Sequence, residues 1–243
     1  MLRESIARIE ALPDDATVLD VGGWACPLAR ATAVLDLMPY ATRGLYGSHD
    51  RTAERFTADS WIQHDICARE PFPFADDAFD MVVCSHTLED VRDPVWVAAE
   101  LSRVGRAGYV EVPSRLQEQS WGVNGEYVGW SHHHWLVDVD EAAQHVDFVF
   151  KPHVLHHPGP TGWAFSSRFA EGLTEAERVS TLWWSGTFTA RERIFDDVAA
   201  LVAWLVEPVC AHAGRDPDPV GLGRRARLER RLRGRRRVRP PAG

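Results

Sequence analysis

Lysine is almost absent from this chain: of its 27 basic residues, only Lys151 is a lysine. Because arginine replaces lysine throughout, this bias does not by itself mark a binding site. Cysteine is scarce as well, and Cys26, Cys67, Cys84 and Cys210 show no C-x-x-C spacing. That pattern suggests neither a disulfide framework nor a thiolate zinc site, and we expect buried reduced thiols.

Long apolar runs are also missing. The longest run, residues 198–206, has nine residues, whereas a membrane-spanning helix needs about 20. The opening segment, Met-Leu-Arg-Glu-Ser, lacks the apolar stretch of a signal peptide. We therefore expect a cytoplasmic protein without a membrane span.

What is present is the composition of a globular protein. The 243 residues are 45% hydrophobic and 26% charged, which excludes a chain that is disordered as a whole. The net charge is −8, yet residues 224–239 hold ten arginines and one glutamate, so the rest of the chain carries −17. We expect one domain over residues 1–210 and an Arg-rich tail over residues 211–243. Such a tail binds nucleic acid or an anionic membrane surface in some proteins, and is a solvated helix or a disordered segment in others.

The first half of the chain alternates predicted strands with predicted helices. Residues 2–11 have the apolar spacing of a short helix, and Asp93 before Pro94 predicts the start of a second one. Short β-branched runs bounded by Gly, Asp or Pro predict buried parallel strands. These runs are residues 17–21, 33–37, 79–84 and 108–112, with residues 61–64 as a weaker candidate. The alternation predicts an α/β layered fold.

The second half is rich in aromatic residues and histidine. Seven of the ten tryptophans and seven of the eleven histidines lie between Trp121 and Trp204. Residues 146–150 and 163–167 are candidate strands. Thr-x-x-Glu patterns predict helices that begin at Thr174 and Thr189. In the second of these helices an apolar face is predicted to pack in the core; its members are Ile194, Val198, Leu201, Val202 and Leu205.

A glycine turn follows the first predicted strand. Val18-Leu-Asp-Val-Gly-Gly23 lets the backbone approach a ligand at the carboxyl edge of the sheet, where open α/β sheets bind ligands. Asp36, at the end of the next strand, is suited to accept hydrogen bonds from ribose hydroxyls, so adenosine is the implied ligand. A dinucleotide site would need a third glycine and an acid about 20 residues on, but Asp36 follows Gly23 by only 13 residues.

Further motifs complete the pattern in order along the chain. They are Asp65-Ile66, the run from Pro71 to His86, Leu88-Glu-Asp-Val91, Glu100-Leu-Ser-Arg-Val104 and Gly108-Tyr-Val-Glu-Val-Pro113. With the glycine turn, this set resembles the class I S-adenosylmethionine-dependent methyltransferases of the small-molecule type over about residues 15–115. The resemblance implies a doubly wound, mainly parallel, Rossmann-like sheet of seven strands whose last strand is antiparallel. It also implies S-adenosylmethionine as methyl donor and S-adenosylhomocysteine as product.

The resemblance assigns roles to individual residues. It implies that Asp20, Gly22 and Gly23 line the methionine part of the cofactor, with Trp24 in the same loop. Asp36 would hold the ribose, with Leu37 beside it. Asp65 and Ile66 would meet the adenine, while Ser85 and His86 would face the sulfonium; the full set of cofactor-binding candidates is Asp20, Gly22, Gly23, Trp24, Asp36, Leu37, Asp65, Ile66 and Ser85.

Two features depart from the family pattern. The first loop reads Gly22-Gly-Trp-Ala-Cys-Pro27, and only 11 residues separate Val21 from Ala33, so the helix expected there must be short. Asp90 also stands where the family often has histidine. A purely structural interpretation is the alternative for both acids: Asp20 would cap the turn, and Asp36 would be a surface acid.

Three successive histidines, His132, His133 and His134, lie beside Trp130 and Trp135. In a strand, His132 and His134 share one face and His133 points to the other, so a divalent metal would need a third ligand such as Glu118 or His153. A neutral histidine is suited to act as general base for an acceptor hydroxyl. Our candidates for this role are His86 and His133, with packing against the tryptophans as the structural alternative and no metal site predicted.

These observations predict methyl transfer to an oxygen, or less favourably a nitrogen, of a small molecule or glycan. The region from residue 116 to 170 is predicted to contact the acceptor. An RNA methyltransferase that uses the basic tail is an alternative, although the acidic body argues against nucleic acid as a partner. A non-catalytic binding protein of the same fold is a third possibility.

Overall fold

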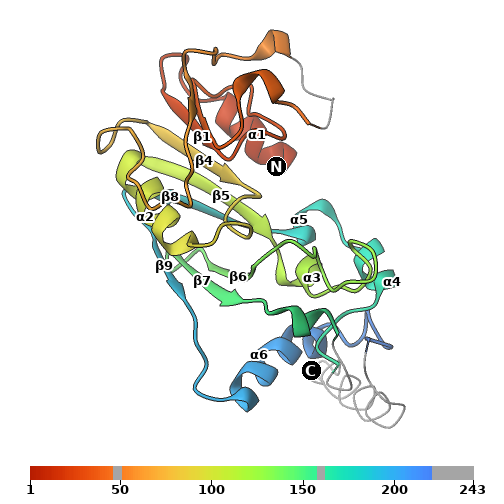
Figure 1. The fold of residues 1–243 in the computed structure, drawn as a ribbon. Helices are drawn as coiled ribbons and strands as arrows, with labels where there is room; N and C mark the ends of the chain where they lie inside the picture. Colours follow the sequence, from red (N-terminus) through yellow and green to blue (C-terminus); the bar gives the residue numbers. More distant parts are fainter. Residues whose placement is uncertain (46–50, 158–161, 221–243) are drawn as a thin grey trace, which may run out of the picture. The chain divides into compact units, whose positions relative to one another are not determined.

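The computed structural model of the protein describes residues 1–45, 51–157 and 162–220 (Figure 1). Contacts divide these residues into two compact units. Unit 1 comprises Met1–Val112, Val137–Phe148 and Ser180–Glu192, and unit 2 comprises Pro113–Leu136, Val149–Val179 and the chain from Arg193 onward. The boundary that we expect at residue 210 stays a prediction, and the Arg-rich tail beyond residue 220 lies outside the described residues.

Helices, 3-10 turns and strands follow one another along both units. In chain order they are α1 (Arg3–Glu10), β1 (Val18–Val21), β2 (Ala33–Asp36), η1 (Tyr40–Thr42), η2 (Arg51–Ala53), β3 (Trp61–Gln63), β4 (Met81–Ser85), α2 (Pro94–Val104), β5 (Ala107–Pro113), α3 (Arg115–Glu118), β6 (Trp135–Asp140), β7 (His145–Phe150), η3 (His153–His156), α4 (Ser167–Glu171), α5 (Glu175–Arg178), β8 (Val179–Ser185), β9 (Thr189–Glu192) and α6 (Val198–Ala211).

The main sheet has the strand order β3-β2-β1-β4-β5-β8, and Figure 1 shows β1, β4 and β5 side by side. The first five strands are parallel neighbours, with Asp20 opposite Val34 on one side and Val83 on the other. The amide of Gly186, just after β8, donates to the carbonyl of Arg106, just before β5, at 2.8 Å. The end of β8 therefore meets the start of β5, which makes β8 antiparallel.

The mainly parallel α/β fold is confirmed, but the main sheet has six strands and not seven in the part of the chain that the structure describes. The reason is that β6 and β7 join a separate three-stranded sheet in the order β6-β7-β9. In that sheet β7 and β9 are parallel, with His145 opposite Thr189.

Local sequence signals set several of these elements. The predicted strands over residues 17–21, 33–37, 61–64, 79–84 and 108–112 are confirmed, with small shifts in their ends. The side chain of Asp93 accepts a hydrogen bond from the amide of Trp96 and caps α2 as expected. Thr174 and Glu177 form the predicted capping box of α5.

The helix that we predict from Thr189 is wrong. Residues 189–192 form β9, because pairing with β7 outweighs the local capping signal. The helix begins at Val198 instead, and the side chain of Asp197 caps it by accepting a hydrogen bond from the amide of Ala200.

The predicted strand over residues 163–167 is also wrong: Ala164 and Phe165 form only isolated bridges, and α4 begins at Ser167. The apolar face of the last helix is only partly buried. Leu205 is 2% exposed, whereas Ile194 and Val198 are 81% and 75% exposed.

Each unit has its own apolar core. In unit 1, residues of α1 and of strands β1, β2, β3, β4 and β5 pack together, with Ile9, Val18, Val34 and Val83 fully buried. This packing holds the carboxyl ends of the parallel strands at one edge of the sheet. In unit 2, the core is made by Val128, Leu136, Val149, Trp163, Ala164, Trp204 and Leu205. Among the described residues, no helix is both long and apolar enough to cross a membrane.

Candidate functional site

The chain turns sharply at the end of β1. Gly22 has φ +79°, a left-handed value that favours glycine, and its amide donates to the carbonyl of Leu35 at 2.9 Å. A Cβ atom on Gly23 would lie 2.2 Å from Oδ2 of Asp20. Both positions therefore require glycine, one for its backbone conformation and the other because a carboxylate lies against it.

Asp20 is buried within this turn and is 4% exposed. Its Oδ2 accepts a hydrogen bond from the amide of Leu28 at 2.8 Å. Burial raises the pKa of Asp20 to about 7, and the neighbouring carboxylate of Asp36 adds to the rise although the bond from Leu28 opposes it. A buried acid of this kind is stabilised in its charged form by a cationic neighbour.

Asp36 ends β2 beside Asp20. Its Oδ2 accepts from the amide of Trp24 at 2.9 Å, and its Oδ1 accepts from the amide of Met38 at 2.7 Å. Burial also raises the pKa of Asp36. Each carboxylate oxygen has a second lone pair, so the two amides orient the group and leave acceptor capacity for a ligand.

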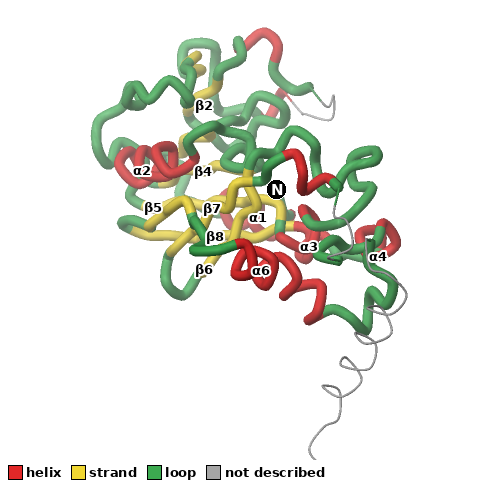
Figure 2. Tube along the Cα trace, turned by 60° about the horizontal axis from the view of Figure 1, so that its bottom comes forward, coloured by secondary structure: helices red, strands yellow, loops and turns green. Residues whose placement is uncertain are grey.

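The loop between β1 and β2 contains no helix, which corrects our expectation of a short one. Figure 2 shows loops on both sides of β2. The amides of this loop bond to Asp20 and Asp36, and the indole Nε1 of Trp24 donates to the carbonyl of Thr42 at 2.8 Å. The loop has only 11 residues. Its amides donate to these side chains and not to carbonyl groups within a helix. Leu37, just after β2, is 56% exposed.

Asp65 and Ile66 follow β3 at the same edge of the sheet. The amide of His64 donates to the carbonyl of Asp36 at 2.8 Å, which fixes the end of β3 beside β2. The carboxylate of Asp65 accepts from the amide of Cys67 at 2.8 Å. The predicted adenine-binding pair therefore follows the strand that neighbours β2, which ends in the predicted ribose-binding acid.

His86 follows β4 with a left-handed backbone, φ +52°. Its Nε2 lies 3.2 Å from Glu111 Oε1, and its Nδ1 lies 3.4 Å from Glu89 Oε1. Burial lowers the pKa of His86, but the carboxylates of Glu111 and Glu89 outweigh that effect and raise it to about 9. His86 therefore carries a proton at neutral pH.

Glu111 is the centre of a buried network in unit 1. It accepts hydrogen bonds from the hydroxyl of Tyr109 at 2.5 Å and from the amide of Leu2 at 2.9 Å, and the hydroxyl of Ser85 lies 3.4 Å away. Burial raises the pKa of Glu111, but bonds from His86, Tyr109 and Leu2 lower it to about 2. Glu111 therefore stays ionised.

Our sequence analysis did not identify Glu111 or Glu89 as site residues. Glu111 could have been found because it is an acid inside the apolar run of residues 108–112. A carboxylate in a buried strand needs hydrogen-bond or charged partners, which indicates a polar network there. Glu89 is 1% exposed, and its oxygens accept no hydrogen bond from the described residues.

Unit 2 holds a second polar cluster, which we call the Glu118 cluster: Glu118, His133 and Lys151. Oε2 of Glu118 lies 3.0 Å from Nδ1 of His133, and Oε1 accepts from Nζ of Lys151 at 2.5 Å. The amide of Trp130 also donates to Oε1 at 3.1 Å. The sequence analysis considered Glu118 as a neighbour of the histidines but did not include Lys151.

The three successive histidines alternate in burial, although they precede β6 and do not lie in a strand. His133 is 8% exposed, whereas His132 and His134 are exposed. The ring of His133 stacks on Trp130 with centroids 5.9 Å apart and planes inclined by 28°. His133 is therefore the histidine of this run that unit 2 fixes in place.

Lys151 changes what Glu118 can bind. Its ammonium lies on the carboxylate that the sequence analysis considered as a third metal ligand beside the histidines. Because a second cation at that carboxylate would be repelled, Glu118 is poorly suited to be a metal ligand in this arrangement.

Comparisons with known proteins agree with the geometry in unit 1. A family model described as "Methyltransferase domain" matches residues 22–110. Among curated proteins, no sequence matches the chain significantly.

Solved structures match part of the chain. A SAM-dependent methyltransferase from Aquifex aeolicus is 16% identical, with 46% of this chain and 64% of that chain covered and a TM-score of 0.36. The YcgJ protein from Bacillus subtilis is 17% identical, with 46% and 52% covered and a TM-score of 0.37. An arsenic(III) S-adenosylmethionine methyltransferase from Chlamydomonas reinhardtii is 20% identical, with 41% and 39% covered and a TM-score of 0.32. The chain thus spans less than two thirds of the length of each of these structures.

Proposed function

Residues 22–110 form a class I S-adenosylmethionine-dependent methyltransferase domain, and from this premise we propose that the chain transfers a methyl group from S-adenosylmethionine to an oxygen of a small molecule or glycan. A nitrogen acceptor is the less favoured variant of the same proposal.

The observation that carries this proposal is the edge of the main sheet at Asp20 and Asp36. Two buried carboxylates lie beside a glycine turn in which a side chain at Gly23 would collide with Asp20. Glu89, close to the same edge, is a buried carboxylate whose Oε1 lies 3.4 Å from Nδ1 of His86. At a glycine turn a ligand can lie close to the backbone, and carboxylates lie beside this one. Such a site fits an adenosine that carries a cationic sulfonium group.

The bound cofactor supplies an activated methyl group on a sulfonium with a good leaving group. The chain's residues then have to bind the cofactor and the acceptor and orient the acceptor atom toward the methyl group. No covalent intermediate with the protein is needed. Asp36 would accept from the ribose hydroxyls, and Asp65 and Ile66 would contact the adenine. Asp20, with Gly22 and Gly23, would hold the amino-acid part, and Ser85 would face the sulfonium.

A general base would take the proton of the acceptor hydroxyl. We propose His133 for this role, because it is the buried histidine of the run and its Nδ1 lies 3.0 Å from Oε2 of Glu118. His86 was the other candidate. Its pKa of about 9 means that it is protonated at neutral pH, so a role in orienting groups or donating a proton fits it better than proton abstraction.

A small acceptor is favoured over a nucleic acid because the chain outside residues 224–239 carries −17, whereas an RNA duplex needs a basic surface. The tryptophans and histidines of the second half suit a flat aromatic acceptor or the apolar face of a sugar. A cytoplasmic location is part of the same proposal.

Calorimetric titration of the full chain with S-adenosylmethionine, S-adenosylhomocysteine and NAD tests the cofactor assignment. We expect the two adenosyl compounds to bind and NAD not to bind. Binding of NAD alone would overturn the proposal.

The second candidate is a non-catalytic binding protein of the same fold. It is favoured by the loop between β1 and β2, which lacks a helix and bonds directly to Asp36 through Trp24. A stably folded chain that binds none of the three compounds would select this candidate.

A further inference from the structure

Unit 1 contains a cavity of about 420 Å³ at the amino edge of the main sheet. Its walls include Met81 at the start of β4, Ala107 at the start of β5 and Ser185 at the end of the antiparallel strand β8. Asp36, in contrast, ends β2 at the carboxyl edge. The volume lies within the range of about 300–1,000 Å³ that is usual for small-molecule sites. The cavity is therefore large enough for a small ligand and separate from the candidate cofactor site.

The inner wall of this cavity is apolar. Ile9 is fully buried, and Trp184 and Met81 are 4% and 5% exposed. Trp183, which also lines the cavity, packs on the ring of Tyr109 with centroids 4.5 Å apart. Two indole rings among aliphatic side chains suit a flat apolar group of a ligand.

Arg8, on α1, supplies a positive charge at the cavity. Its guanidinium carbon lies 3.8 Å from the centroid of the Trp183 ring, so the planar group stacks on the indole. Stacking uses the face of a guanidinium and leaves the N–H donors along its edge for an acceptor. In the part of the chain that the structure describes, Arg8 forms no ion pair, and Glu4, one turn earlier on α1, is an exposed acid that is not paired with it. The edge of the guanidinium is therefore available to an anion.

Asp80 and Gln144 also line the cavity, and both are bonded to other groups. The carboxylate of Asp80 accepts from the amide and the hydroxyl of Thr17, each at 2.9 Å, and from Nη1 of Arg106 at 2.6 Å. These bonds lower the pKa of Asp80, and Arg106 balances its charge. The side chain amide of Gln144 donates to two backbone carbonyls. The charge of Arg8 is thus not balanced by the acid of the cavity wall, which favours an anionic ligand.

We propose that this cavity is a second ligand site, which binds an aromatic carboxylate. The ring of the ligand lies between the apolar walls, and its carboxylate accepts hydrogen bonds from the edge of the Arg8 guanidinium, a geometry in which arginine binds carboxylates with two bonds. The site is separate from Asp20 and Asp36, so the proposal does not depend on methyl transfer.

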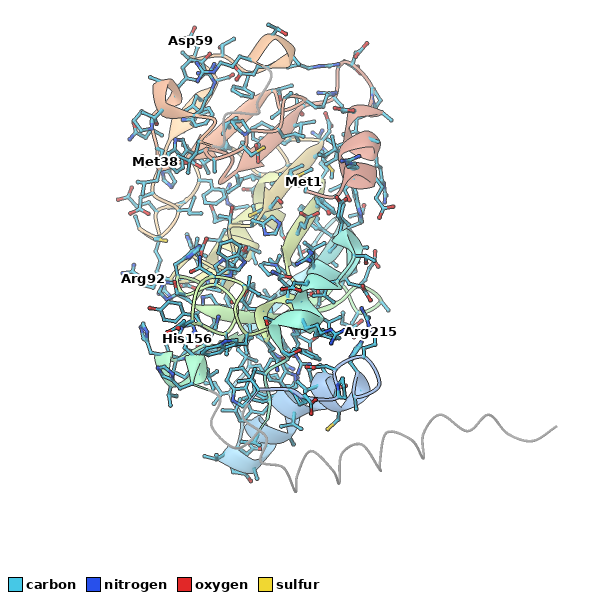
Figure 3. The ribbon with its side chains drawn as sticks, turned by 90° about the vertical axis from the view of Figure 1, so that its right-hand side faces the viewer. Met1, Met38, Asp59, Arg92, His156 and Arg215 are labelled. Carbon is cyan, nitrogen blue, oxygen red and sulfur yellow. The ribbon has the colours of Figure 1, made fainter. Side chains whose placement is uncertain are left out.

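Methyl NMR of the full chain tests the proposal, with 2-naphthoate as the probe. The chain has three methionines. Met81 lines the cavity, whereas the amide of Met38 donates to Asp36 at the other edge; Met38 and Met1 are labelled in Figure 3. In a sample labelled with 13C-methyl methionine, the Met81 signal is identified by its loss in Met81→Leu. We expect 2-naphthoate to shift the Met81 signal to saturation and to leave the Met38 signal unchanged.

The charge of the ligand is tested with 2-naphthamide, which has the same ring without the carboxylate and should bind more weakly. Arg8→Gln should weaken the binding of 2-naphthoate by about tenfold or more, because it removes a charge-assisted hydrogen bond. The same variant should leave the binding of 2-naphthamide little changed. Arg3→Gln, at an exposed arginine of the same helix, is the matched control and should bind 2-naphthoate as the wild type does.

Ala107→Leu narrows the cavity and should weaken the binding of both probes. If Arg8→Gln does not fold, the comparison of the two probes on the wild type and on Ala107→Leu still decides. The proposal is overturned by a Met81 signal that does not respond to 2-naphthoate, by equal affinity of the wild type and Arg8→Gln, or by unchanged binding in Ala107→Leu. Displacement of the probe by S-adenosylhomocysteine together with a shift of the Met38 signal would place the probe at the carboxyl edge and would also overturn it.

Discussion

His86 and His133 each lie beside a buried glutamate: Nε2 of His86 is 3.2 Å from Glu111, and Nδ1 of His133 is 3.0 Å from Glu118. Glu111 accepts hydrogen bonds from Tyr109 and Leu2, and the N-terminal ammonium of Met1 lies 3.3 Å from its Oε1. Glu118 receives the ammonium of Lys151. At the scale of single residues, each buried glutamate is therefore paired with an ammonium as well as with a histidine, as a buried charge requires.

His86 predicts a pH dependence of stability. Its pKa is about 9 in the folded chain, against 6.5 as the ordinary value, so its contribution is fully present below pH 6.5 and is lost as the pH rises through 9. We expect the melting temperature of the wild type to fall more steeply between pH 6.5 and 9 than that of His86→Asn, since asparagine tolerates the left-handed backbone.

Melting curves recorded across this range by circular dichroism check the His86 prediction. His157→Asn, at an exposed histidine, is the matched control and should follow the wild type. Parallel pH profiles of His86→Asn and the wild type would contradict the prediction.

Asp36 predicts a loss of cofactor affinity. Asp36→Ala removes a charge-assisted acceptor from the ribose, which is expected to cost about 1.5–3 kcal/mol of binding free energy, or roughly 10–150-fold in the dissociation constant. Calorimetry with S-adenosylhomocysteine measures this change. Asp59→Ala, at an exposed acid, serves as control, and an unchanged affinity in Asp36→Ala would remove Asp36 from the site.

At the scale of elements, the sequence predicted the parallel strands well because each is a short apolar run that pairs on both sides. The strand at residues 33–36 and its terminal acid were found in this way. Residues 189–192 were misjudged because their capping pattern is local, whereas the pairing of β9 with β7 joins segments far apart in the chain.

The local geometry of the candidate site was predictable where it depends on a turn and a strand end, as for Gly22 and Asp36. It was not predictable where residues meet through tertiary folding. Glu118 and Lys151 are 33 positions apart, and neither stands in a motif that would pair them.

The glycine turn after β1 makes a prediction about this element. In Gly23→Val the side chain would enter the space of the Asp20 carboxylate, so cofactor binding should be abolished while the parallel strands persist. Calorimetry and circular dichroism on the same sample measure both properties. Gly214→Ala, where a Cβ meets nothing within 4 Å, is the control; normal affinity in Gly23→Val would exclude the turn from the site.

At the scale of the whole molecule, the chain divides into two compact units, and each carries one of the two histidine–glutamate arrangements. The family match covers residues 22–110 and so falls within unit 1. The assignment of the cofactor therefore depends on unit 1, and the assignment of the base depends on unit 2.

Removal of residues 224–243 tests whether the methyl acceptor is a small molecule or an RNA. If the acceptor is a small molecule, the truncated chain should keep its methyl transfer activity, because the ten arginines of this segment serve no role in binding a small acceptor. Turnover with radiolabelled methyl donor measures this. Loss of activity together with loss of RNA binding would favour an RNA acceptor instead.

The burial of the only lysine has a practical consequence for chemistry performed on the protein. Acylating reagents that modify primary amines find no lysine side chain on the folded surface, because the single one lies in the interior of unit 2. Acylation of Lys151 can proceed only when that interior opens, so its rate at a fixed reagent concentration reports how often the interior opens. The same scarcity leaves the α-amino group of Met1 as the other primary amine of the chain, so amine-directed immobilisation of the folded protein would act there.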